Sequence, residues 1–147
     1  MQADLSTSRD IAHVIQLSVA PVFLLSGIGA MLAVMTNRLA RIVDRARGHE
    51  SERGRAETGR HASIDERLSV LSKRAKLINR AITLCTVTAL LVCTVVVTLF
   101  LGAFLEFDAS IPVATFFVGA MITFFGGLLS FLREIAVATR ALRIGAQ

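Results

Sequence analysis

The chain has 147 residues and a formal net charge of +5, and 54% of its residues are hydrophobic. That share is above the usual composition of soluble domains, which argues against an ordinary water-soluble fold of this length. The two cysteines, Cys85 and Cys93, fall inside one apolar stretch without CxxC spacing, which argues against a disulfide framework and a zinc site.

Three uncharged stretches hold most of the apolar residues: 11–37, 81–105 and 109–132. Each exceeds the roughly 20 residues that a helix needs to cross about 30 Å of hydrocarbon. An open strand in lipid would leave its backbone amides unpaired, so a helix is the expected structure. We therefore predict an all-α integral membrane protein with three transmembrane helices in one membrane domain, residues 1–147.

The first predicted span is followed by a basic segment with helical periodicity. Arg38, Arg41 and Arg45 lie on one face, opposite an apolar face of Leu39, Ile42, Val43 and Ala46. Residues 48–59 contain three glycines and predict a flexible turn. A return helix is then expected to begin at Ser63, because Ser63 and Glu66 have the spacing of a capping box.

The return helix carries a narrow apolar seam that runs into the second span. Its members recur in steps of three and four: Ile64, Leu68, Leu71, Ala75, Ile78 and Ile82. We predict that residues 38–80 form an antiparallel helical hairpin, with the seams buried against each other or against other subunits. A hairpin lying flat on the bilayer is the alternative, and the narrow stripe and mixed charges of the exposed faces disfavour it.

The basic residues are unevenly distributed along the chain. Twelve of the sixteen lysines and arginines lie between Arg38 and Arg80, three follow the third span, and only Arg9 precedes the first. Basic flanks stay in the cytoplasm, so the hairpin and the tail, residues 133–147, are predicted to be cytoplasmic and the N-terminus outside. A cleaved signal peptide is not expected, because the start is not basic and the apolar run is too long.

The cytoplasmic ends of the three predicted spans form the first candidate site. Glu134 is the only acidic residue at that depth, and an ion pair with Arg38 or Arg80 is expected. We interpret the group as a charged collar that fixes helix register, with a selectivity ring or ligand site as the alternative. The collar comprises Asn37, Arg38, Arg41, Asp44, Arg45, Asn79, Arg80 and Glu134.

Two further stripes lie inside the spans. The second span has a threonine stripe that could line a pore or hydrogen-bond to neighbouring helices: Thr83, Thr86, Thr94 and Thr98. The third span has small residues one turn apart, which predict close helix packing: Gly119, Thr123 and Gly127. The first span has a similar small-residue stripe: Ser26, Ala30, Ala33 and Asn37.

The basic composition favours contact with anionic lipid headgroups, at about 1 kcal/mol for each Lys or Arg near the surface. Nucleic acid is not an expected partner, because the chain lacks a recognisable binding module and has no Trp or Tyr to stack a base. An enzyme is not expected either, since no nucleophile and base pair, metal cluster or phosphate loop is visible. No cofactor is predicted.

The segment "VAPVFLLSGIGAMLAVMTNRLARIVDRAR" and the later "INRAI" resemble a family of small bacterial membrane proteins labelled only as a domain of unknown function. The resemblance is firmest over "NRLARIVDR", residues 37–45. It implies a multi-span helical fold in the bacterial inner membrane and brings no activity or site residues.

Two functions remain open at this stage. Three spans can hardly enclose a conduit, so a homo-oligomer packed through the small-residue stripes is expected. The first hypothesis is an oligomeric membrane scaffold or adaptor whose cytoplasmic hairpin recruits a protein partner or anionic lipid. The alternative is a homo-oligomeric ion or small-solute channel lined by the threonines of the second span.

Overall fold

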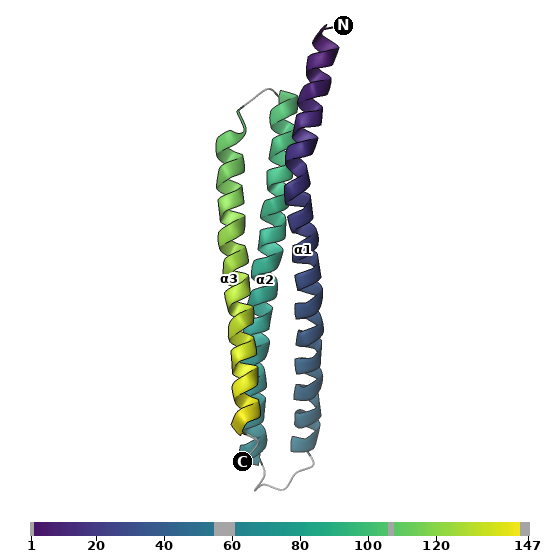
Figure 1. Ribbon diagram of the computed structural model, residues 1–147. Helices are drawn as coiled ribbons and strands as arrows, with labels where there is room; N and C mark the ends of the chain where they lie inside the picture. The colour runs from purple at the N-terminus through teal and green to yellow at the C-terminus, as the bar shows by residue number, and fades with distance from the viewer. Residues whose placement is uncertain (1, 55–60, 106–107, 145–147) are drawn as a thin grey trace. The chain divides into compact units, whose positions relative to one another are not determined.

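The computed structural model describes residues 2–54, 61–105 and 108–144, and nearly all of these residues form three long α-helices (Figure 1). Helix α1 spans Gln2–Arg53, α2 spans His61–Leu105, and α3 spans Ser110–Ile144. The all-α fold class is confirmed.

All three helices are long and apolar enough to cross a membrane, over Ile11–Glu52, Ile64–Leu105 and Ser110–Thr139. Large apolar side chains are widely exposed along them, including Phe23 at 74%, Phe104 at 81% and Ile111 at 75%. Such exposure to water costs about 25 cal/mol for each Å² of apolar surface, whereas lipid tails solvate the same surface readily. These are the properties of a small membrane protein.

The helix boundaries differ from the predicted ones around the first connection. Helix α1 continues through Gly48 to Arg53, so the turn predicted from residue 48 starts too early. An interior glycine costs a helix about 1 kcal/mol, which packing of a long amphipathic helix can outweigh. The chain leaves the helix at Gly54, whose amide donates to the Glu50 carbonyl at 3.2 Å. The rest of the predicted turn, residues 55–59, lies outside the described residues.

The start of the return helix is also corrected. Helix α2 begins at His61, two residues before the predicted cap Ser63, whose side chain lies outside the described part of the chain. The spacing of Ser63 and Glu66 therefore occurs one half-turn inside the helix and does not mark its first residue.

The contacts divide the chain into two units, each containing a segment of all three helices. Unit 1 comprises Met1–Met31 and Cys85–Phe125, and unit 2 comprises Leu32–Leu84 and Gly126–Gln147. In unit 1, α2 and α3 meet through small and hydroxyl residues. The Thr88 and Thr123 hydroxyl oxygens lie 2.9 Å apart, and a Cβ built on Gly119 would meet Leu91 at 3.7 Å.

Unit 2 contains the predicted seams of α1 and α2. Ile42 from α1 and Leu71 and Ile78 from α2 form one buried cluster, with Leu39, Ala46, Ala75 and Ile82 packed against it. The two amphipathic segments therefore bury their seams against each other within one chain, as they run in opposite directions (Figure 1). Burial of the seams leaves the charged faces of both helices exposed.

Candidate functional site

Glu134 lies on the buried face of α3 in unit 2. Gly127, Ser130 and Glu134 are buried at spacings of three and four residues, which places them along one stripe of the helix. The Glu134 side chain has no solvent exposure. An ionised carboxylate in such a position is unfavourable unless cations and hydrogen-bond donors surround it.

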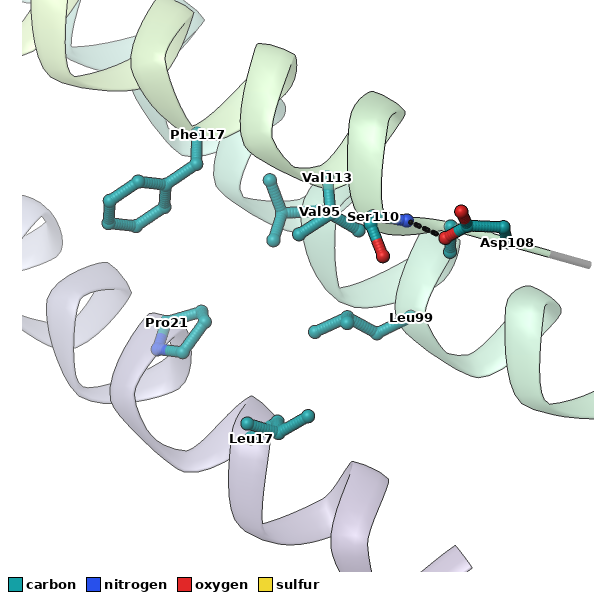
Figure 2. A pocket seen from close by; sticks show the side chains of 9 residues that line it. Leu17, Pro21, Val95, Leu99, Asp108, Ser110, Val113 and Phe117 are labelled. Carbon is teal, nitrogen blue, oxygen red and sulfur yellow. Dashed lines mark hydrogen bonds between the residues drawn. The ribbon is translucent and has the colours of Figure 1, made fainter. Parts of the chain in front are cut away.

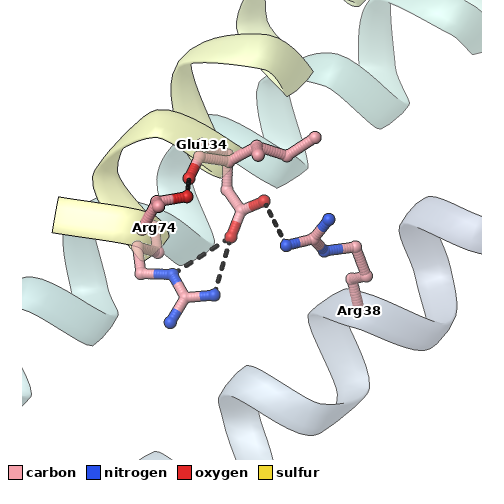
Figure 3. Close-up of polar contacts among 5 residues, drawn as sticks. Arg38, Arg74 and Glu134 are labelled. Atoms are coloured by element: carbon pink, nitrogen blue, oxygen red, sulfur yellow. Dashed lines mark hydrogen bonds and ion pairs between the residues drawn. The ribbon is translucent and has the colours of Figure 1, made fainter. Parts of the chain in front are cut away.

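Arg74 on α2 supplies the closest donors to this carboxylate (Figure 3). Its Nε and Nη2 donate to Glu134 Oε1 at 3.0 and 2.9 Å. Both bonds are charge-assisted, and charge-assisted bonds are stronger than bonds between neutral groups. The Arg74 side chain is itself only 15% exposed, so the pair is shielded from water and salt.

Arg38 on α1 reaches the other carboxylate oxygen. Its Nη2 lies 3.2 Å from Glu134 Oε2, an ion-pair distance, while Oε2 accepts no aligned hydrogen bond. The guanidinium also lies over the Phe131 ring, 5.4 Å from its centroid, where the negative face of the ring attracts the cation. Arg38 is therefore held from two sides by α3, although its side chain remains 33% exposed.

The three charged side chains come from three different helices and meet at one point of unit 2. We call Arg38, Arg74 and Glu134 the arginine clasp. Two guanidiniums around one carboxylate leave a net charge of +1, and each contact ties α3 to one of the other helices. A wrong rotation or shift of any helix would leave a charge buried without its partner, which is costly.

The clasp corresponds only in part to the predicted collar. Arg38 and Glu134 are brought together, whereas the other six predicted members are exposed: Asn37, Arg41, Asp44, Arg45, Asn79 and Arg80. Arg80 lies at the expected depth, but it is six residues after Arg74, which corresponds to a rotation of about 240° around α2. It therefore lies on a different face of the helix from Arg74. Arg74 was missed, and its spacing from the buried Leu71 and Ile78 is the signal that could have found it.

The predicted threonine stripe of α2 is more exposed than the clasp. Thr83 and Thr86 are exposed in the single chain, and Thr94 and Thr98 are half-buried. Three of the hydroxyls donate to carbonyls one turn earlier in α2: Thr83 to Asn79 at 3.0 Å, Thr94 to Leu90 at 2.9 Å and Thr98 to Thr94 at 2.7 Å. These bonds give the hydroxyls a partner inside lipid without a neighbouring helix.

The two small-residue stripes also differ. On α3, Gly119 and Thr123 face α2 in unit 1, and Gly127 is buried in unit 2, so this stripe is occupied within the chain. On α1, all four members of the stripe are exposed: Ser26, Ala30, Ala33 and Asn37. The surface of α1 therefore retains a small-residue face that no described residue covers.

A comparison with known families gives one match. Residues 18–144 match a family model described as "Protein of unknown function (DUF2721)", which covers α1 from residue 18, all of α2 and α3, and every member of the clasp. No curated protein and no solved structure gives a significant match.

Proposed function

We propose that this chain, which belongs to the DUF2721 family, is a homo-oligomeric membrane scaffold with a rigid cytoplasmic arm. The family description carries no activity, so the proposal rests on the geometry of unit 2. The observation that carries it is the arginine clasp, which joins three helices through a buried carboxylate.

The arm consists of the helical segments beyond the uncharged stretches. Residues 38–53 of α1 and 61–80 of α2 extend about 24 and 30 Å at 1.5 Å per residue. Their apolar seams are buried in the cluster of Ile42, Leu71 and Ile78. The surface that remains carries both signs of charge, including Arg41, Asp44, Arg45, Lys73 and Lys76. A stiff surface of this kind suits a cytoplasmic protein partner and, near the bilayer, anionic headgroups.

The distribution of charge supports a cytoplasmic location of the arm. The connection between α2 and α3, residues 106–109, contains no Lys or Arg, whereas twelve basic residues lie between Arg38 and Arg80. By the positive-inside rule, the N-terminus is outside and the C-terminus inside. We therefore propose a three-span protein of a bacterial inner membrane, which the charge distribution and the family resemblance support.

Cysteine labelling tests this orientation. Ser51→Cys at the end of α1 and Ser110→Cys at the start of α3 place thiols at exposed positions on opposite ends of the predicted spans. With an impermeant thiol reagent added to intact cells, we expect Ser110→Cys to react and Ser51→Cys to react only after permeabilisation. The natural chain, with both cysteines in the second span, gives the background. Reaction of Ser51→Cys in intact cells would overturn the orientation.

The exposed stripe of α1 supports a homo-oligomer. In lipid, helices associate where small residues let their backbones approach closely, because lipid provides no hydrophobic driving force. The α3 stripe is already used within the chain, so we assign the contact between subunits to Ser26, Ala30, Ala33 and Asn37 of α1.

A mass measurement of the detergent-extracted protein tests the contact. The natural chain should give a multiple of 15.8 kDa, and Ala33→Phe should shift the particle towards the monomer by preventing close approach. Val34→Phe is the matched control, because Val34 is the next residue and is 50% exposed, and it should leave the mass unchanged. A natural chain that is monomeric would contradict the proposal.

The same particles distinguish the scaffold from a channel. Thr83 and Thr86 are exposed on α2 and are the positions at which a channel axis would form in an oligomer. If the protein is a scaffold, liposomes that contain the purified particles should show no ion flux. Ion flux that Thr83→Leu abolishes would instead favour the channel.

A further inference from the structure

A second site lies in unit 1, where all three helices line one pocket of about 600 Å³ (Figure 2). Its body is apolar, with Val95 and Leu99 from α2 and Val113 and Phe117 from α3. Ligand pockets in proteins span about 300–1,000 Å³ and are mostly apolar with a few placed polar groups. The size and lining of this pocket therefore suit a flexible apolar chain.

The α1 wall of the pocket contains a proline within a continuous helix. Leu17 and Pro21 both line the pocket, and Figure 2 shows the Pro21 ring facing it. Pro21 has no amide hydrogen, so the Leu17 carbonyl loses the donor that an α-helix normally provides four residues later. The α1 wall therefore has one backbone acceptor that its own helix does not satisfy at residue 21, and a ligand that donates hydrogen bonds is compatible with it.

The polar end of the pocket carries a carboxylate. Asp108 lines it, and the Ser110 amide donates to Asp108 Oδ1 at 2.9 Å. Hydrogen bonds from the Ser110 side chain and from its amide lower the pKa of Asp108 below its usual value. The carboxyl group is therefore ionised at neutral pH and places a negative charge beside an apolar pocket.

We propose that this pocket binds a phospholipid with a primary ammonium headgroup. The ammonium group supplies a positive charge for Asp108 and several N–H donors for nearby acceptors, and an acyl chain fills the space along Val95, Val113 and Phe117. A trimethylammonium headgroup has the charge but no N–H donor, and an anionic headgroup is repelled by Asp108. Binding itself is independent of the proposed oligomer, arm and orientation.

Native mass spectrometry of the full chain released from nanodiscs tests the site. The bilayer contains equal parts of phosphatidylethanolamine, phosphatidylcholine and phosphatidylglycerol. We expect retained phosphatidylethanolamine to exceed phosphatidylcholine by about fivefold, the ratio that corresponds to about 1 kcal/mol for one hydrogen bond that the trimethylammonium group cannot donate. The ratio compares phosphatidylethanolamine with phosphatidylcholine only, so phosphatidylglycerol bound to the basic arm does not affect it.

Three variants separate the site from general lipid contact. Asp108→Asn should lower the ratio towards one, because an amide oxygen accepts a weaker hydrogen bond from the ammonium group than a carboxylate does. Val113→Trp should fill the pocket and reduce retained lipid of both kinds. Asp44→Asn removes an exposed carboxylate of unit 2 and should leave the ratio unchanged. Circular dichroism checks that each variant remains helical. Equal retention of the two lipids by the natural chain, or an unchanged ratio in Asp108→Asn, would overturn the proposal. Neither result would alter the mass and labelling tests of the scaffold.

Discussion

Replacing Arg74 by alanine is expected to lower the free energy of unfolding by about 3–5 kcal/mol, the usual cost of removing one partner from a buried ion pair. Glu134 has no solvent exposure, and Arg74 provides both hydrogen bonds to its Oε1. Without Arg74 the carboxylate keeps only the unaligned contact with Arg38. The loss should appear as a lower midpoint in denaturant titration of the detergent-solubilised protein, followed by circular dichroism.

Arg80→Ala is the matched control for this experiment. It removes the same side chain from the same helix, six residues away, at an exposed position, where substitutions usually change stability by less than about 0.5 kcal/mol. The double variant Arg74→Ala with Glu134→Gln should lose less free energy of unfolding than the sum of the two single losses. The reason is that the neutral amide no longer requires a cation. Equal effects of Arg74→Ala and Arg80→Ala would show that the clasp does not stabilise unit 2.

The second large effect is expected at the seam between α1 and α2. Ile78 is fully buried in the cluster with Ile42 and Leu71, so Ile78→Ala leaves a cavity and should cost about 2–5 kcal/mol. The cost contains both the lost transfer free energy and the lost packing contacts around the cavity. The same denaturant titration measures it.

Leu90→Ala is the control for apolar truncation on α2. Leu90 is 63% exposed within an apolar span, so lipid tails replace the lost contacts and the effect should stay below about 1 kcal/mol. If Ile78→Ala and Leu90→Ala had the same effect, the seam would not be a packed interface within one chain. Loss of stability only at high protein dilution would instead place the seam between subunits.

The three helices could be predicted from the sequence because an uncharged stretch of more than 20 residues has few alternatives in water or in lipid. Their ends could not. Gly48 and Ser63 each have a strong local preference, for a turn and for a helix cap, but both lie inside helices in the structure. Tertiary packing along the seams outweighs local preferences of about 1 kcal/mol.

Only part of the clasp could be predicted from the sequence, because the sequence gives the depth of a residue more directly than its rotation about the helix. Glu134 and Arg38 are found from depth alone, since both follow an uncharged stretch at the same end of the spans. Arg74 and Arg80 lie nearly two helical turns apart, and the choice between them depends on rotation about α2. The long arginine side chain lets Arg74 reach Glu134. Depth favoured Arg80, whereas the angular position relative to Leu71 and Ile78 favours Arg74.

The order of the clasp along the chain has a consequence for biosynthesis. Both guanidiniums, Arg38 and Arg74, emerge from the ribosome some sixty residues or more before the carboxylate of Glu134. Until the last helix arrives, the two guanidiniums would approach each other without the carboxylate that separates them, and their repulsion opposes the packing of the α1 and α2 seams. Tight closure of the two helices is thus expected to follow insertion of the third helix, so a nascent chain that stops early should be more sensitive to protease than the full chain.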